Sequence, residues 1–290
     1  MKVSGFTFIR NAIKYDYPIK EAIQSILPLC DEVIVMVGNS EDETRQLIES
    51  IGDEKIKIYD SVWDDTLREG GKVLALETDK AFSKIAADSD WAFYIQGDEI
   101  FHEHGIDAVR DAMVKYKDDK KVEGLLFNYK HFYGSFDYVG NSRRWYRKEI
   151  RVVRNDKSIH SYRDAQGFRK NNKLLKVKQV SAFIYHYGWV KPPAAMQAKQ
   201  ESFHKMWHSD EWVNENIKKS DEFDYSQIDS LSLFQGVHPK VIQERIAKQN
   251  WKFTFDPTKR KMPFLSRLLH GVEDFTGWRI GEWRNYKVVR

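Results

Sequence analysis

The first hundred residues alternate between short apolar runs and amphipathic stretches. Residues 3–9 (VSGFTFI) are rich in β-forming side chains, and residues 33–37 (VIVMV) form a continuous apolar run, as in a strand covered on both faces. Between them, residues 18–27 begin with a proline suited to a first helical turn and place apolar side chains at helical spacing. The pattern predicts a strand, a helix and a second strand.

The same alternation continues to residue 100. Ser40 is followed by Glu43 at the spacing of a capping box, which predicts a helix over residues 41–51. The other predicted elements are a short strand at 56–58, a long helix over 71–87 and a strand at 91–95 (WAFYI). Strands that alternate with helices form a mostly parallel sheet with right-handed crossovers, so an α/β fold is expected.

A polar cluster follows each of these predicted strands. The clusters are Arg10, residues 38–40, Asp60 and residues 96–99 (QGDE). The carboxyl ends of parallel strands share one edge of a sheet, and α/β proteins bind ligands at that edge. The sequence therefore predicts a ligand site there, centred on residues 96–99.

The pattern changes beyond residue 120. Further strands are predicted at 125–132, 150–153 and 177–187. Pro192 and Pro193 then mark a boundary, after which the chain is helical, then irregular, and ends in a basic aromatic tail. We expect a first domain over residues 1–190 and a helical extension over residues 191–290.

The composition narrows the class of protein. Hydrophobic residues make up 41% of the 290, and no apolar run approaches the roughly 18 residues that span a bilayer. A net charge of +4 is too small to indicate a nucleic-acid partner. Met1 leads into a strand-like segment without the apolar block of a signal peptide, and the single cysteine, Cys30, excludes an intrachain disulfide. These features predict a cytoplasmic protein that does not bind nucleic acid.

Asp98 and Glu99 stand directly after the apolar strand at 91–95. Carboxylates are the ligands that Mg²⁺ and Mn²⁺ prefer, and a divalent cation stabilises a departing diphosphate by neutralising charge on its oxygens. Gly97 permits a ligand to approach the backbone closely. The alternative is a polar turn that merely ends a strand, and the turn by itself does not decide between the two.

Several segments, taken in order, resemble one enzyme family. FTFIRNAIKYDYPIKEAIQSILPLCDEVIVMVGNSEDET resembles the opening of family 2 glycosyltransferases of the GT-A fold, which run through a strand, an Asn-containing turn, a helix and a second strand into a Ser-x-Asp-x-Thr turn. DWAFYIQGDE resembles their Asp-Trp, apolar strand and DxD-Glu signature, and WDDTLREGGKVLALETDKAF resembles the stretch before their long helix. The resemblance covers about the first 100 residues and continues more loosely to IYHYGW, which ends at Trp189.

The resemblance implies a Rossmann-like GT-A fold, with a mostly parallel sheet and flanking helices. It also implies an enzyme that moves a sugar, with inversion, from a nucleotide-diphosphate donor to a hydroxyl of a glycan or a lipid-linked acceptor. The family commonly works in cell-surface polysaccharide synthesis. A divalent cofactor, Mn²⁺ or Mg²⁺, is implied, held by Asp98, with Glu99 and His186 as candidates to complete its shell. For His186, a packed and hydrogen-bonded strand histidine is the alternative.

The donor pocket is expected at the strand ends. The residues assigned to it are Phe6, Arg10, Asn39, Arg68, Lys72, Gln96 and Gly97. Arg68 and Lys72 would contact phosphate, although solvated surface is the default for both. The sequence departs from the family at two positions, because Asn39 stands where an Asp usually reads the base and Gln96 replaces the first Asp of the DxD signature.

An inverting transferase also needs a general base beside the acceptor hydroxyl. Asp164, in HSYRDAQG, lies between late strands where the family carries such a residue, and Asp137 and Glu149 are weaker rivals. A loop Asp that caps a turn is the alternative for Asp164. The arginine-rich stretch at 143–154 suits either a phosphorylated acceptor or solvated strand edges.

The C-terminal tail carries one apolar helical face. Its members are Phe264, Leu265, Leu268, Leu269, Val272 and Phe275, with Lys259, Arg260, Lys261 and Arg267 beside them. A helix that packs across the main domain is favoured. A helix that rests on an anionic membrane surface, at the inner face of the membrane, stays open.

Two rival classes also stay open. A nucleotidyltransferase would carry a Gly-rich basic loop after the first strand, and FTFIRN is not such a loop. A non-catalytic sugar-nucleotide-binding protein on a degenerate GT-A domain is kept open by Gln96. A zinc protease is excluded, because Lys205 follows His204 where the protease motif needs a Glu.

Overall fold

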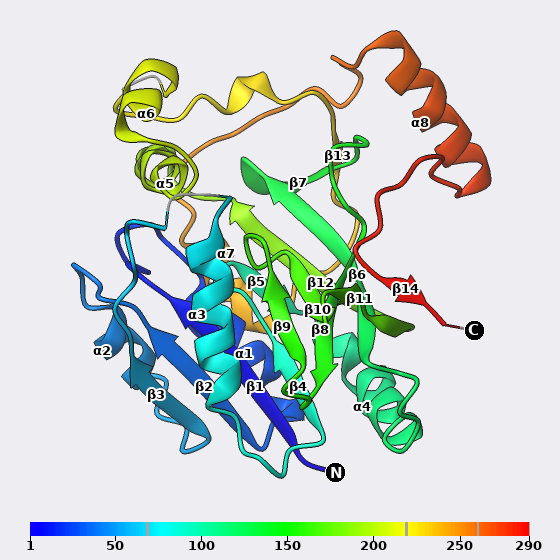
Figure 1. Ribbon diagram of the computed structural model, residues 1–290. Helices are drawn as coiled ribbons and strands as arrows, with labels where there is room; N and C mark the ends of the chain where they lie inside the picture. Colours follow the sequence, from blue (N-terminus) through cyan, green and yellow to red (C-terminus); the bar gives the residue numbers. More distant parts are fainter. Residues whose placement is uncertain (68–69, 218–219, 260, 290) are drawn as a thin grey trace.

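A computed structural model describes residues 1–67, 70–217, 220–259 and 261–289. Its centre is an eleven-stranded mixed sheet in which eight strands follow the order β13-β7-β6-β8-β4-β1-β2-β3, and β12 pairs with β5, β6 and β14 (Figure 1). The first strands are β1 (Val3–Ile9), β2 (Glu32–Val37), β3 (Ile56–Asp60) and β4 (Trp91–Tyr94). All neighbours among these four are parallel, so their carboxyl ends share one edge. The predicted α/β fold is confirmed.

Helices between these strands cover both faces of the sheet. They are α1 (Ile19–Ile26), α2 (Thr44–Glu49), α3 (Lys72–Ser83) and α4 (Ile106–Lys115). Buried apolar residues of α1 and α4 share one core cluster with β1, β2 and β4, whereas Ala81 and Phe82 of α3 belong to a second cluster that also includes residues of the sheet. The helices predicted at 18–27 and 71–87 are therefore confirmed, the latter with an earlier end.

The second helix begins later than the capping-box pattern predicts. The Ser40 hydroxyl accepts a hydrogen bond from the Asn11 backbone N–H (3.0 Å) and donates to the Gly38 carbonyl (3.2 Å). It ties the ends of β1 and β2 together instead of capping a helix, and α2 starts only at Thr44. The Thr44 hydroxyl likewise accepts from the Ala12 N–H at 2.7 Å, so this motif joins two strand ends.

The later strands bring further residues to the same edge. In the central sheet they are β5 (Glu99–Phe101), β6 (Gly124–Tyr133), β7 (Ser135–Gly140), β8 (Lys148–Arg154) and β12 (Lys176–Trp189). A separate sheet consists of β9 (Ile159–Tyr162), β10 (Gly167–Lys170) and β11 (Lys173–Leu174). Strand β8 runs antiparallel to β4, so its amino end lies at the carboxyl end of β4. Strand β12 runs antiparallel to β5, with His186 opposite Glu99.

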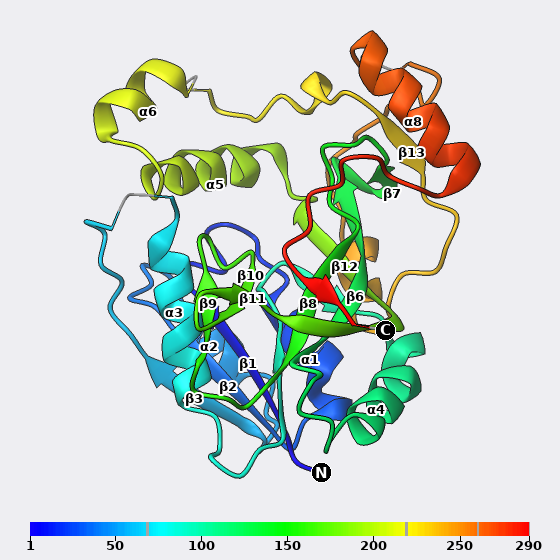
Figure 2. The same cartoon turned by 45° about the vertical axis from the view of Figure 1, so that its right-hand side comes forward.

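The C-terminal third returns over this edge (Figures 1 and 2). Its elements are α5 (Pro193–Lys205), α6 (Asp210–Asn216), β13 (Leu231–Leu233), α7 (Gln243–Ala247), α8 (Phe264–Thr276) and β14 (Lys287–Val288), and short 3-10 turns lie at Leu27–Leu29, Glu103–Gly105, Tyr225–Gln227 and Lys240–Ile242. Helices α5 and α6 lie on one side of this end of the molecule and α8 on the other. Within the described ranges, no helix has both the length and the apolar character that crossing a bilayer requires.

Candidate functional site

Asp98 lies in the turn after β4 and is contacted from two distant elements. Its Oδ2 is 3.6 Å from Nε2 of His186 on β12 and 3.1 Å from Nζ of Lys199 on α5. The Asp98 carbonyl also accepts a hydrogen bond from the Tyr187 N–H at 2.8 Å, which fixes the turn against β12. The fold thus brings together the predicted Asp98 and His186, and it adds a lysine that the sequence pattern did not indicate.

Gly188 makes the close approach of Asp98 and His186 sterically possible. A Cβ at this position would lie 2.5 Å from His186 Nε2 and 2.6 Å from Asp98 Oδ2. The Gly188 carbonyl also accepts a hydrogen bond from Lys199 Nζ at 3.0 Å. Gly188 stands in the IYHYGW segment, yet the sequence alone does not show which side chains would fill its space.

The surroundings of Asp98 are rich in positive charge. Burial by itself would raise the pKa of Asp98, but Lys199 and His186 hold it well below its usual range. Lys191 is fully buried with Nζ 2.7 Å from the Asp16 carbonyl and 4.3 Å from the centre of the Tyr17 ring. Burial, together with the charge of Lys199, lowers the pKa of Lys191 well below its ordinary value. The Asp98 carboxylate thus contacts one lysine and one histidine, and the amine of the second lysine is bonded to a backbone carbonyl.

Glu99 has a structural role, which corrects its prediction as a metal ligand. Its carboxylate is fully buried and accepts hydrogen bonds from Arg151 Nε (2.7 Å), from a second Arg151 nitrogen and from the Tyr129 hydroxyl. The Gln96 backbone N–H donates to it as well, at 3.2 Å. Because an arginine already neutralises Glu99, a cation would have to displace that pair.

Gln96 connects the turn after β4 to the loop that carries Asp164. Its side-chain Nε2 donates to the Ala165 carbonyl at 3.2 Å and to the Tyr94 hydroxyl at 3.3 Å. The neighbouring Gly97 is buried, and a Cβ there would lie 2.7 Å from Ile9 Cδ1. The missing side chain at Gly97 thus makes room for β1, a reason that differs from the predicted approach of a ligand.

Asp164 sits in a strained loop at the same edge. Its neighbours Arg163 and Ala165 have φ of 56° and 61°, values that non-glycine residues rarely adopt and that cluster at functional sites. Burial raises the pKa of Asp164. A Cβ at Gly71, just before α3, would lie 2.8 Å from the Asp164 Cβ, so the loop packs tightly against the start of that helix.

The two rivals of Asp164 have less suitable surroundings. Glu149 is almost fully buried, and burial raises its pKa to about 8, so its carboxyl holds a proton at neutral pH. Its Oε2 has no hydrogen-bond partner among the residues that the structure describes. Asp137 is exposed on β7, where its carboxylate accepts from Ser135. A base must be ionised at neutral pH, which disfavours Glu149.

The predicted nucleotide contacts divide into two groups. Arg10 and Asn39 meet at Trp63, because the Arg10 guanidinium lies 5.6 Å from the centre of the Trp63 ring and the Trp63 backbone N–H donates to Asn39 Oδ1 at 3.2 Å. Lys72 is the first residue of α3 and is exposed. It follows Gly71, which packs against the Asp164 loop. Arg68 lies outside the described residues.

Phe6 cannot line a pocket, which corrects its prediction. Its side chain is fully buried, with ring centres 5.1 Å from both Phe82 and Tyr94. Alternation along β1 places Phe6 toward α3, in the core beneath the sheet edge.

Asp98 and His186 are the two predicted metal ligands that lie close together, and a cation bound at Asp98 Oδ2 would displace Lys199 from that oxygen. An oxygen and a nitrogen 3.6 Å apart can bind one ion between them, and Mg²⁺ or Mn²⁺ takes its other ligands from water and from substrate phosphates. Glu99 adds no free oxygen, because both of its oxygens accept hydrogen bonds from Arg151, whereas the Gln96 side chain forms its hydrogen bonds through Nε2. Among the described residues, the one group of three clustered ligand side chains is elsewhere, at residues 102–104.

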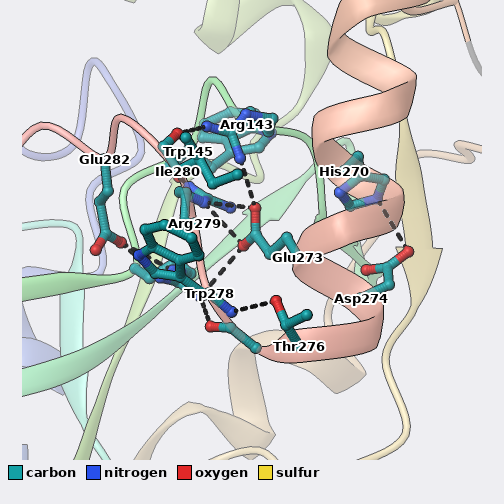
Figure 3. Close-up of polar contacts among 12 residues, drawn as sticks. Arg143, Trp145, His270, Glu273, Asp274, Thr276, Trp278, Arg279, Ile280 and Glu282 are labelled. Carbon is teal, nitrogen blue, oxygen red and sulfur yellow. Dashed lines mark hydrogen bonds and ion pairs between the residues drawn. The ribbon is translucent and has the colours of Figure 1, made fainter.

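Some arginines of the stretch at 143–154 bind the C-terminal tail, and others lie in the core. Neither a contact with a phosphorylated acceptor nor a solvated strand edge therefore describes the whole stretch. Arg143 donates to Glu273 of α8 at 3.2 Å, and Arg147 to Glu282 at 2.9 Å (Figure 3). Helix α8 therefore turns polar residues inward. Its apolar residues point outward, and Phe275 is 93% exposed.

Comparisons with known proteins give only distant similarity. No family model matches the chain, and no curated protein matches it. The structure of residues 1–349 of S. aureus TarS is 16% identical over 76% of this chain and 67% of that one, with a TM-score of 0.40. A longer S. aureus TarS structure has a TM-score of 0.38, at 16% identity over 70% of this chain and 39% of that one.

Glucosyl-3-phosphoglycerate synthase from Mycobacterium tuberculosis, in complex with Mg²⁺ and uridine diphosphate, is 19% identical over 46% of this chain and 43% of that one, with a TM-score of 0.30. The chain thus spans less than half the length of two of these three structures. These values are too low to assign the chain to a family or an activity.

Proposed function

We propose that this protein is a GT-A type glycosyltransferase that uses a nucleotide-diphosphate sugar. The observation that carries the proposal is the meeting of Asp98, His186 and Lys199 at the carboxyl ends of parallel strands. A carboxylate and an imidazole there supply ligands for a divalent cation, and the lysine supplies charge for phosphate. The donor pocket extends from this point toward Arg10 and Asn39, which meet at Trp63.

Asp98 and His186 would hold Mn²⁺ or Mg²⁺, which supplies neutralising charge for the departing diphosphate. Lys199 is positioned to pair with a phosphate oxygen beside the same carboxylate, and Lys191 lies nearby with its amine bonded to the Asp16 carbonyl. Charge-assisted hydrogen bonds of this kind are among the strongest in proteins. Both lysines belong to the residues beyond 190, so this part of the chain contributes directly to the proposed donor site.

Asp164 is the proposed general base. Its carboxylate takes the proton of the acceptor hydroxyl as that oxygen bonds to the anomeric carbon of the sugar. The bond between this carbon and the diphosphate oxygen breaks at the same time, and the nucleoside diphosphate leaves with the electron pair. Attack from the face opposite the diphosphate inverts the anomeric configuration.

Thermal unfolding with nucleotides tests the donor site. A ligand that binds the folded protein raises its melting temperature by mass action. UDP, GDP, CMP and dTDP are added with and without Mn²⁺ to the wild type, to Asp98→Ala and to the control Asp107→Ala, which changes an exposed Asp on α4. We expect one nucleoside diphosphate to stabilise the wild type and the control, more so with Mn²⁺, and Asp98→Ala to lose that metal dependence. If no nucleotide stabilises the wild type, the donor-site proposal fails.

We further propose that the outer face of α8 rests on an anionic lipid surface. Phe264, Leu265, Leu268 and Phe275 are each more than half exposed, and Trp278 and Trp283 after the helix are exposed as well. Lys259 and Lys261 precede the helix, where they would meet anionic headgroups. Such a position would bring the enzyme to a lipid-linked acceptor.

A further inference from the structure

A cavity of about 420 Å³ lies between α8 and the sheet. Its walls come from β6, β7, the segment 141–147, α8 and Arg279. Figure 3 shows Trp145, Glu273 and Arg279 from this wall, together with Arg143, which contacts Glu273 from outside the lining. None of the sequence predictions pointed to this space, because its walls come from segments more than a hundred residues apart.

The walls of the cavity carry polar atoms without partners. Among the described residues, five of its buried side-chain atoms have no hydrogen-bond partner: His131 Nδ1, Asn141 Oδ1, Ser142 Oγ, Trp145 Nε1 and His270 Nδ1. His131, Ser142 and His270 are each more than nine-tenths buried. Buried polar groups are normally paired, so a cluster of unpaired ones around one cavity indicates an occupant that supplies hydrogen bonds.

The chemistry of these atoms includes both donors and acceptors. His131 Nε2 lies 3.0 Å from the Tyr146 carbonyl, which can only accept, so Nε2 carries a hydrogen. Asn141 Oδ1 can only accept, and it has no partner among the described residues. Trp145 Nε1 can only donate, and the Ser142 hydroxyl can do either.

The arginines in the wall are already paired with carboxylates, and the Lys130 ammonium lies over the rings of Phe183, Tyr185 and Phe234. Arg279 Nε lies 2.8 Å from both carboxylate oxygens of Glu273, and Arg147 donates to Glu282. The unpaired groups are amide, hydroxyl, indole and imidazole atoms, and the aromatic rings of Trp145 and Tyr146 flank them. Such donors and acceptors beside aromatic faces match the hydroxyls and apolar faces of a saccharide.

The cavity is separated from the candidate site by one side chain. The ring of His131 lies 5.2 Å from that of His186, and His186 contacts Asp98. We propose that this cavity binds a neutral saccharide and forms an acceptor subsite closed by α8. The role of the cavity as an acceptor subsite rests on the proposed function, whereas the binding of a neutral saccharide rests on the cavity alone.

Saturation-transfer NMR tests the proposal with glucose, galactose, N-acetylglucosamine and inorganic phosphate as probes. The variants are Ser142→Ala combined with Trp145→Phe, which removes two unpaired groups from the wall, and the control Ser230→Ala. Ser230 is also fully buried with an unpaired hydroxyl, but it lies outside the cavity. We expect signal from at least one sugar with the wild type and with Ser230→Ala, loss of most of that signal in the double variant, and no signal from phosphate.

Absence of transfer to every sugar, or equal transfer in the double variant, overturns the proposal. A phosphate signal that the double variant loses overturns the assignment to a neutral ligand. Single variants Ser142→Ala and Trp145→Phe replace the double variant if its thermal unfolding shows that it does not fold. Nucleotide stabilisation is measured on the same samples. Stabilisation by a nucleotide without sugar binding refutes the cavity proposal alone, whereas sugar binding without any nucleotide response refutes the glycosyltransferase.

Discussion

Lys199 Nζ lies 3.1 Å from Asp98 Oδ2, although the two residues are 101 positions apart in the chain. The contact places an ammonium group from α5 on the carboxylate that follows β4. The same lysine donates to the Gly188 carbonyl and lies 5.0 Å from the centre of the Tyr17 ring. Its position is therefore set from three sides, and it is held beside the point where the proposed metal and diphosphate would bind.

Replacing Lys199 by Met should weaken diphosphate binding. A hydrogen bond to a charged group contributes about 1.5–3 kcal/mol, so the affinity for the stabilising nucleoside diphosphate should fall roughly 10- to 100-fold. Titration calorimetry measures the change, with Lys205→Met on the exposed side of the same helix as the control. Equal affinities in the two variants would show that Lys199 only balances the charge of Asp98.

Replacing Gly188 by Ala should disturb the pair that it accommodates. The new methyl group would overlap His186 Nε2 and Asp98 Oδ2, and overpacking typically costs about 1–3 kcal/mol. We expect a lower melting temperature and loss of the Mn²⁺-dependent part of nucleotide stabilisation. Gly271→Ala is the matched control, because a Cβ there meets no atom within 4 Å. A Gly188→Ala protein that keeps its full metal response would contradict the site geometry.

Replacing Asp164 by Asn should abolish sugar transfer and leave nucleotide binding intact. The amide keeps the size of the side chain but cannot take the proton of the acceptor hydroxyl, and loss of a general base typically lowers turnover about 10²- to 10⁴-fold. Product formation from the donor that thermal unfolding identifies gives the readout. Asp156→Asn, at the beginning of the turn before β9, is the control. Retained turnover in Asp164→Asn would exclude it as the base.

Glu149 should make stability depend on pH. Burial raises its pKa from 4.5 to about 8, so the folded state keeps a proton that the unfolded state releases above pH 4.5. The contribution of Glu149 to the free energy of unfolding is largest below pH 4.5, the pKa of the unfolded state. It is lost as the pH rises toward 8, by at most a few kcal/mol.

Glu149→Gln, which is neutral at every pH, tests this dependence. We expect the variant to gain stability relative to the wild type at pH 8 and to gain little at pH 4.5, as measured by urea unfolding. A difference between the two proteins that stays constant across this range would show that Glu149 does not carry a raised pKa.

Replacing Leu268 and Phe275 by Ser should release the protein from lipid. Both side chains point away from the body of the protein, so the change should leave the melting temperature nearly unchanged while it removes apolar area from the proposed lipid contact. Sedimentation with vesicles of phosphatidylglycerol and phosphatidylcholine measures binding. Wild-type protein that stays in solution with these vesicles, or a variant that sediments equally well, would refute the membrane contact.

The hydrophobic pattern determined much of the first half of the fold. Parallel strands β1 to β4 and helices α1 and α3 appear where periodicity predicts them, because burial of a continuous apolar strand or of one helical face is a local property of the sequence. The order of strands and helices also sufficed to bring Asp98 to a polar edge. The pattern failed at Ser40, whose hydroxyl satisfies the end of β1 in place of a helix cap.

Only the tertiary structure decided which polar residues are available for chemistry. Asp98 and Glu99 are adjacent acids in the sequence, yet Arg151 neutralises one of them in the core and Lys199 meets the other at the site. Phe6 lies in the middle of β1 and is buried in the core, whereas Arg10 follows the end of that strand and reaches Trp63. Such differences depend on partners brought from distant segments, and the energy of a buried charge is set by those partners rather than by its neighbours in sequence.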